Sequence, residues 1–131
     1  MTEKEKMLKG LIYDANRDAQ LIAERMECKK KCREYNDAAP DDMARRRSLL
    51  DSILGDIAGD VLIEQPFYCD YGYNISVGHN FFANFNVTIL DEAPVNFGDN
   101  CVIGAGSVVV KDVPANCMAA GNPCKFIKPI D

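Results

Sequence analysis

The residue best suited to acid–base chemistry in this chain of 131 amino acids is its single histidine, His79. An imidazole titrates near neutral pH, so it can take a proton from a hydroxyl group that attacks a carbonyl carbon. His79 lies in the segment Val77-Gly78-His79-Asn80, where glycine and asparagine favour a bend in the backbone. A solvated histidine at an outward corner is the simpler interpretation, and it gives His79 no catalytic role.

Six cysteines offer a second kind of chemistry. Cys28 and Cys32 stand four residues apart, a spacing that puts two thiols on one face of a helix, as in a metal-binding pair. No other Cys/His pair has matching spacing, and a structural zinc site needs four ligands. We therefore expect ordinary helix residues and no metal. Because the N-terminal residues do not resemble a secretion signal, we expect free thiols and a cytoplasmic location.

The charge balance limits the partners. Twenty acidic residues against fifteen basic ones give a net charge of −5, which argues against nucleic-acid binding. We therefore interpret the runs Lys29-Lys30-Lys31 and Arg45-Arg46-Arg47 as solvated helix faces. No apolar run reaches the length that a membrane span needs, so we expect no membrane partner.

The elements that must position these residues divide into two regions. Residues 1–60 hold 25 of the 35 charged residues and no valine, whereas residues 61–131 hold all nine valines. Straight-chain and charged residues favour helices, and β-branched residues favour strands. We predict a helical segment over residues 1–60 and a β region over residues 61–131. In the first, Thr2 and Glu5 indicate a capping box, a second helix spans about 19–35, and a third runs from Pro40 toward Gly55.

A six-residue repeat organises the β region. One row of small or apolar residues is Ile63, Cys69, Ile75, Phe81, Val87, Val95, Cys101, Ser107 and Val113. A second row is Val77, Ala83, Ile89, Phe97, Ile103 and Val109. The spacing is six except for one step of eight in each row, near residues 90–94. A hexapeptide period is typical of a parallel β-helix, in which three strands make one turn and the rows point inward.

Several segments resemble one family. Gly104-Ala105-Gly106-Ser107 and Ala119-Ala120-Gly121-Asn122-Pro123 resemble the last turn of hexapeptide-repeat acyltransferases. Asn80-Phe81-Phe82-Ala83-Asn84 and the helical start, with Tyr13-Asp14, resemble the maltose and galactoside O-acetyltransferases. The resemblance implies a mainly β fold, a short left-handed β-helix with an N-terminal helical segment. It also implies a homotrimer that moves an acetyl group from acetyl-CoA to a sugar hydroxyl.

The chain departs from that family where the catalytic histidine should be. Phe97-Gly98-Asp99-Asn100 leads directly into Cys101-Val102-Ile103-Gly104, as if the chain passed from the first Gly-Asp-Asn corner to the last. Both inward rows stay in phase across this junction, which is what the loss of whole turns predicts. We expect the fold to survive and catalysis to be lost or badly weakened, with no catalytic residue assigned. The alternative is a non-catalytic trimer that binds a sugar or CoA, or a purely structural trimer.

The resemblance also implies binding residues. Those for the sugar acceptor are Asp14, Asp70, Asn84 and Asp91. Those for acetyl-CoA are Ala105, Gly106, Lys111 and Lys125, with Lys128 nearby. Amide and carboxylate groups suit sugar hydroxyls, and lysines suit phosphates. A corner role for Asn84 and a solvated surface for the lysines are the open alternatives.

Overall fold

Three helices form the N-terminal part of the computed structural model, which describes residues 1–130. They are α1 (Glu3–Leu8), α2 (Ala19–Asp37) and α3 (Met43–Ile53). Thr2 and Glu5 form the predicted capping box, and the side chains of Asp18 and Asp42 each accept a backbone N–H at the start of α2 and α3. Across residues 1–130, no helix combines the length and the apolar character that crossing a lipid bilayer requires.

Eleven strands follow and wind into a parallel solenoid of about three turns, which confirms the predicted β-helix. They are β1 (Asp56–Ile57), β2 (Val61–Ile63), β3 (Phe67–Cys69), β4 (Ile75–Val77), β5 (Phe81–Ala83), β6 (Val87–Ile89), β7 (Val95–Phe97), β8 (Cys101–Ile103), β9 (Val108–Val109), β10 (Cys117–Ala120) and β11 (Lys125–Pro129). The three sheets have the orders β1-β4-β7, β11-β10-β8-β5-β2 and β3-β6-β9. All pairs are parallel except β10 with β11. The division at residue 60 stays a prediction.

The two predicted rows form the core of the solenoid. Every member is buried except Cys69, which is partly exposed. Val95, Cys101 and Ser107, which span the junction in question, are at most 2% exposed. The corner between β7 and β8 has three residues, like the corner between β4 and β5 one turn earlier. The predicted register across Asp99-Asn100 is therefore confirmed.

One corner repeats with a stacked asparagine in each turn. Asn80, Asn100 and Asn116 all have φ between 55° and 59°, the left-handed region that asparagine tolerates better than most residues. Their side chains bond to each other, Asn80 Nδ2 to Asn100 Oδ1 at 3.0 Å and Asn100 Nδ2 to Asn116 Oδ1 at 2.8 Å. We call residues 78–80, 98–100 and 114–116 the asparagine corner.

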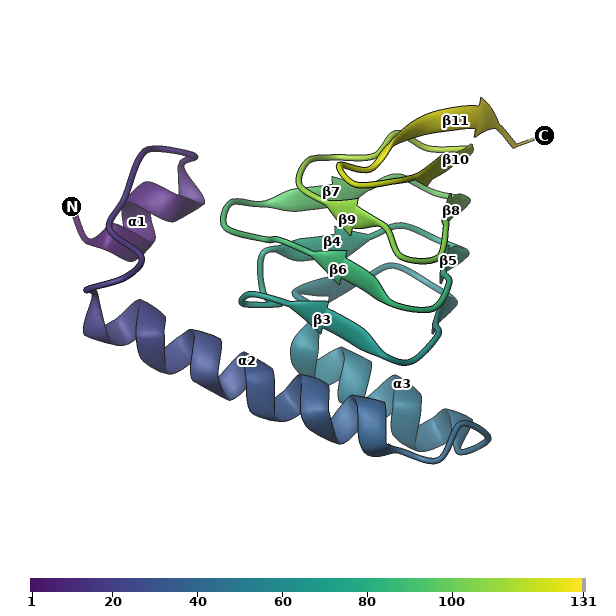
Figure 1. Ribbon diagram of the computed structural model, residues 1–131, viewed down its shortest axis with the longest axis horizontal. Helices are drawn as coiled ribbons and strands as arrows, with labels where there is room; N and C mark the ends of the chain where they lie inside the picture. Colours follow the sequence, from purple (N-terminus) through teal and green to yellow (C-terminus); the bar gives the residue numbers. More distant parts are fainter. Residues whose placement is uncertain (131) are drawn as a thin grey trace.

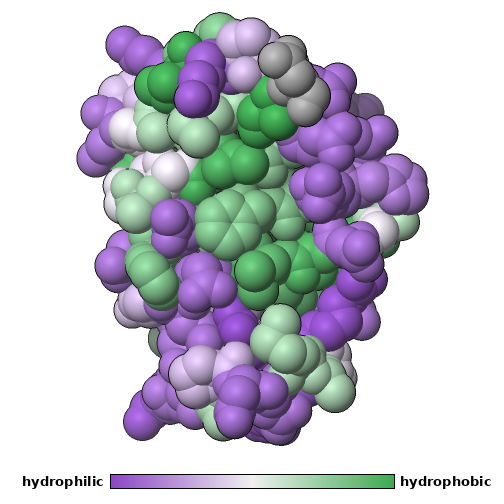
Figure 2. All heavy atoms as spheres, turned by 90° about the vertical axis from the view of Figure 1, so that its right-hand side faces the viewer, coloured by the Kyte–Doolittle hydropathy of each residue, from purple (hydrophilic) through white to green (hydrophobic). Residues whose placement is uncertain are grey.

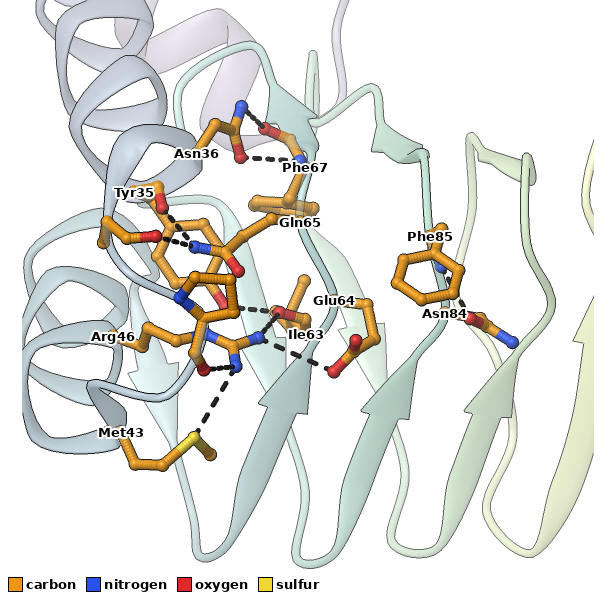
Figure 3. Close-up of polar contacts among 12 residues, drawn as sticks. Tyr35, Asn36, Met43, Arg46, Ile63, Glu64, Gln65, Phe67, Asn84 and Phe85 are labelled. Carbon is orange, nitrogen blue, oxygen red and sulfur yellow. Dashed lines mark hydrogen bonds and ion pairs between the residues drawn. The ribbon is translucent and has the colours of Figure 1, made fainter.

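The helices α2 and α3 cover the first-turn end of the solenoid (Figure 1). Their contact with it is polar as well as apolar (Figure 3): the Tyr35 hydroxyl donates to the carbonyl of Ile63, and Arg46 donates to the same carbonyl at 2.9 Å. Arg46 is only 5% exposed, so the interpretation of all three arginines as a solvated face is wrong for Arg46. It turns inward and donates to the last carbonyl of β2 and to the carbonyl of Pro40.

The buried face of α2 contains two cysteines. Leu21, Cys28, Cys32 and Tyr35 are buried, whereas Ile22 and Met26 are 42% and 50% exposed. The helical period allows either stripe to be apolar, and packing against β3 selects the stripe that contains the two cysteines.

Candidate functional site

The predicted site residues lie mainly on two corners of the solenoid. Asp70 and Asp91 follow β3 and β6 on what we call the acidic corner, residues 70–74 and 90–94. Asn84, Ala105 and Gly106 follow β5 and β8 on what we call the glycine corner, residues 84–86 and 104–107. The third corner is the asparagine corner. One chain therefore separates the acceptor-binding candidates into two groups.

Asp91 organises the acidic corner from inside. Its side chain is fully buried, and Oδ1 accepts the backbone N–H groups of Asp70 and Tyr71, both at 2.9 Å. Oδ2 accepts the N–H of Gly72 at 2.7 Å. Burial raises the pKa of Asp91 to about 6, while these three donors oppose the rise by favouring the ionised form. The carboxylate thus fixes the loop that presents Asp70.

Asp70 is the half-buried carboxylate of this corner. Its Oδ2 has no hydrogen-bond partner, and burial followed by the nearby charge of Glu92 raises its pKa. Beside it, the Tyr71 hydroxyl accepts a bond from Arg25 at 2.6 Å, and the same guanidinium also donates to the carbonyl of Ala15 at 2.7 Å. The Arg25 guanidinium opposes the rise in the pKa of Asp70, because a nearby cation favours the ionised carboxylate.

Asp14 lies in the linker between α1 and α2. Its N–H donates to the Glu3 side chain at 3.1 Å, and its Oδ1 accepts the N–H of Arg17 at 3.3 Å. The preceding residue, Tyr13, donates its hydroxyl to the carbonyl of Glu92 at 2.6 Å. This bond attaches the linker to the acidic corner, so Asp14 and Asp70 belong to the same side of the molecule.

Asn84 makes the glycine corner. Its Oδ1 accepts the N–H of the next residue, Phe85, at 2.8 Å (Figure 3), which is the corner role left open by the sequence. Gly106 donates its N–H to the carbonyl of Phe85 at 2.8 Å and has a φ of 72°. Ala105 and Gly106 are exposed, and no atom lies within 4 Å of where a Cβ of Gly106 would be. The backbone here is open to close approach by a ligand.

The candidate phosphate-binding lysines meet at the last turn. Lys111 follows β9 and Lys125 begins β11, and both are exposed. They line one groove of about 370 Å³ together with Cys124 and Phe126. Two cations beside an aromatic ring can hold an anionic group such as a phosphate.

His79 lies on the asparagine corner, away from both groups. It is exposed, and its backbone N–H donates to Asp99 Oδ1 at 2.7 Å. This agrees with the expected outward position.

Three sulfur atoms converge where α2 meets β3. Cys69 Sγ lies 3.4 Å from Cys28 Sγ and 3.9 Å from Cys32 Sγ. The sequence indicated the Cys28–Cys32 pair, but it placed Cys69 only as an inward residue of the repeat. The sequence does not show that the helix face with Cys28 and Cys32 packs against the strand with Cys69, so the cluster could not be predicted from it.

Comparison with known proteins identifies relatives of this chain. The maltose acetyltransferase hexapeptide capping motif matches residues 6–59. A Saccharomyces cerevisiae protein whose name assigns it to the acetyltransferases is 35% identical over 180 positions, with 96% of this chain and 92% of the relative covered. A Staphylococcus aureus protein named in the same way is 34% identical over 185 positions, covering 100% and 93%. Because this chain has 131 residues, about fifty positions of each relative have no counterpart in it.

Solved structures agree with this assignment. A galactoside acetyltransferase in complex with coenzyme A is 28% identical with a TM-score of 0.72, covering 100% of this chain and 92% of that one. A maltose O-acetyltransferase from Clostridium difficile is 36% identical with a TM-score of 0.65, covering 100% and 98%. A hexapeptide-repeat acetyltransferase from Vibrio cholerae, complexed with acetyl-CoA, is 25% identical with a TM-score of 0.67, covering 100% of both chains. The chain belongs to the maltose and galactoside O-acetyltransferase family of hexapeptide-repeat proteins.

Proposed function

We propose that this chain is a cytoplasmic sugar O-acetyltransferase by descent, which uses the acetyl-CoA site of its family but has weakened or lost catalysis. The observation that carries the proposal is the uninterrupted corner at Asp99-Asn100. Relatives have about fifty positions without a counterpart here, and the solenoid nevertheless runs in register from β7 to β8. Loss of whole turns explains both facts, since a solenoid tolerates that kind of deletion.

The chemistry explains why such a loss matters. Acetyl transfer to a hydroxyl needs a base that takes the hydroxyl proton, and a positioned base contributes on the order of 10²–10⁴ in rate. The one histidine, His79, is exposed on the asparagine corner, whereas the acceptor candidates lie on the other two corners. We therefore assign no catalytic base.

Acceptor binding is proposed for the acidic corner. Asp70 is half-buried near the cation of Arg25, and Asp14 is attached to the same corner through Tyr13. Asp91 supports the site by holding the backbone of residues 70–72, because its two oxygens are already engaged there. Asn84, on the glycine corner, is also proposed to bind the sugar acceptor.

Donor binding is proposed for the last turn. The open backbone at Ala105-Gly106 suits a pantetheine arm, and Lys111 and Lys125 suit its phosphates. Related structures that hold coenzyme A and acetyl-CoA support this choice of ligand. The expected effect of removing both lysines is a CoA affinity at least tenfold weaker, measured by calorimetry. Lys9→Ala, which removes an exposed lysine of the N-terminal segment, is the matched control.

A homotrimer is the proposed assembly, and one face of the solenoid supports it. The outward residues of the large sheet form the aligned row Leu62, Phe82, Val102 and Met118. Figure 2 shows the apolar surface on this side. The outward positions of β4 and β7 are instead the polar residues Ser76 and Asn96. Self-association through the apolar face would bring corners of neighbouring subunits together.

Light scattering tests the assembly. We expect a trimer of the 14.5 kDa chain, and a monomer at micromolar concentration would contradict it. Phe82→Asp should dissociate the trimer, because it puts a charge on the apolar row. Thr88→Asp, at an outward position of β6, should not.

Mass spectrometry of maltose, glucose and galactosides incubated with acetyl-CoA tests catalysis. We expect product formation on the order of 10²–10⁴ below that of a family member with the additional turns. Robust turnover that disappears in His79→Ala would show that His79 acts as the base, against this proposal. Robust turnover that persists in the variant would also contradict it, because catalysis would then be intact without a histidine. No binding of CoA would favour a purely structural trimer.

A further inference from the structure

The three cysteines between α2 and β3 form a compact, enclosed group of sulfur atoms. Cys28 and Cys32 are each 3% exposed, and Cys69 is partly buried. All three Sγ atoms lie within 4.8 Å of one another, with the Cys69 sulfur 3.4 Å from Cys28 and 3.9 Å from Cys32. Cys28 Sγ also donates to the carbonyl of Cys69 at 3.5 Å. The other three cysteines, Cys101, Cys117 and Cys124, lie outside this group.

The spacing of the sulfurs fits a tetrahedral metal ion. Zinc binds thiolates at about 2.3 Å, and two ligands at the tetrahedral angle are then about 3.8 Å apart. The two separations from Cys69, 3.4 and 3.9 Å, lie on either side of that value. Small shifts of the side chains would place all three sulfurs at bonding distance from one ion.

The surroundings leave room for a fourth ligand. Cys32 and Cys69 line a pocket of about 430 Å³, which Lys29, Arg33 and Tyr68 also line. Three thiolates and a divalent ion carry a net charge of −1, and the two cations at the pocket compensate it.

We propose that Cys28, Cys32 and Cys69 form a zinc site with three protein ligands, whose fourth position faces the pocket and takes water or a small anionic or thiol ligand. Each thiol that binds releases its proton to solvent, so binding releases up to three protons and strengthens as pH rises. The site does not depend on the proposed acetyl transfer.

Such a site would join two parts of the chain that otherwise meet through packing and hydrogen bonds. Cys28 and Cys32 belong to α2, while Cys69 ends β3. An ion held by all three fixes the helix against the first solenoid turn. Metal binding should therefore raise the thermal stability of the intact protein, because the unfolded chain does not hold the three thiols together.

Cobalt substitution tests the proposal on the full-length reduced protein. One equivalent of Co²⁺ should give the strong near-ultraviolet band of thiolate-to-cobalt charge transfer and the visible bands of a tetrahedral ion, and one equivalent of Zn²⁺ should abolish both. Zn²⁺ should also raise the unfolding temperature. Cys32→Ser should weaken Zn²⁺ binding at least tenfold, whereas Cys117→Ser, at a buried cysteine outside the cluster, should bind like the wild type.

Three outcomes would overturn the proposal. The first is a reduced wild-type protein that gives no charge-transfer band and no thermal shift. The second is an equal loss of binding in Cys117→Ser and Cys32→Ser. The third is a reduced protein that takes no metal but forms a Cys28–Cys69 disulfide on oxidation, which would make the cluster a redox pair. Since the first result uses the wild type, a variant that fails to fold leaves the test intact.

Discussion

Two regions of this molecule are stabilised in different ways: the interior of the solenoid, and the helical cover formed by α2 and α3. The interior repeats one kind of contact, in which aliphatic residues of successive turns stack in register. The cover combines apolar packing with single polar contacts such as Arg46 to Ile63 and Asn36 to the backbone of Phe67 (Figure 3). The interior can therefore lose or gain whole turns without needing a new kind of contact, whereas the cover fits only the first turn. This difference teaches that tolerance to mutation should follow the kind of contact rather than burial alone.

The largest expected effect is in the cover. Arg46→Ala should destabilise the protein by about 3 kcal/mol, because it removes one of the two donors to the buried Ile63 carbonyl, the donor to the Pro40 carbonyl and the cation paired with Glu64. Chemical denaturation measures this. Arg47→Ala, which removes a more exposed arginine paired with Asp51, should cost under about 1 kcal/mol. Equal losses of unfolding free energy in the two variants would show that the buried contacts of Arg46 contribute no more than the exposed ion pair of Arg47.

A pH effect follows at the acidic corner. The raised pKa of Asp91, about 6, means that the native state binds a proton more readily than the unfolded chain does. Stability from this group is therefore highest below about pH 4, falls as pH rises toward 6, and is then constant, with a total change of about 3 kcal/mol. Asp91→Asn removes that titration, so denaturation curves should show the variant gaining on the wild type between pH 4 and 7. A gain by the wild type instead would mean that the three N–H donors outweigh burial.

The interior predicts a smaller, graded loss. Ile103→Val removes one methylene group from a fully buried position, and we expect a cost of about 0.5–1.5 kcal/mol. The same change at Ile127, which is 55% exposed, should alter the free energy of unfolding by less than about 0.5 kcal/mol. A larger cost at Ile127 than at Ile103 would show that β11 is held by contacts with another subunit.

The smallest effect belongs to His79. Its side chain is exposed on the asparagine corner, so His79→Ala should change stability by less than about 0.5 kcal/mol. Thermal unfolding of the variant beside the wild type measures this. A substantial loss would mean that the imidazole, rather than only the backbone N–H bonded to Asp99, supports the corner.

The same comparison explains how much the sequence could predict. The period of six fixes the phase of every inward residue, so the core of the solenoid followed from spacing alone. A run of three arginines has no period that would show which of them is buried. Arg46 is buried because it donates to the carbonyls of Ile63 and Pro40. At the site, the sequence predicted which corner residues are polar. It could not predict that the Asp91 carboxylate would accept hydrogen bonds from backbone N–H groups, because those partners lie about twenty residues away along the chain.

The antiparallel strand β11 has a consequence for growth of the molecule along its axis. Parallel strands of the last turn end in an open row of backbone groups, onto which another copy could stack and extend the coil without limit. Here the chain reverses, and β11 occupies that row on the large sheet with Lys125 and Lys128 exposed (Figure 1). Helices α2 and α3 close the opposite end. End-to-end stacking is therefore hindered on the large sheet by β11 and at the other end by the helices, which leaves the sides of the solenoid for the assembly proposed above.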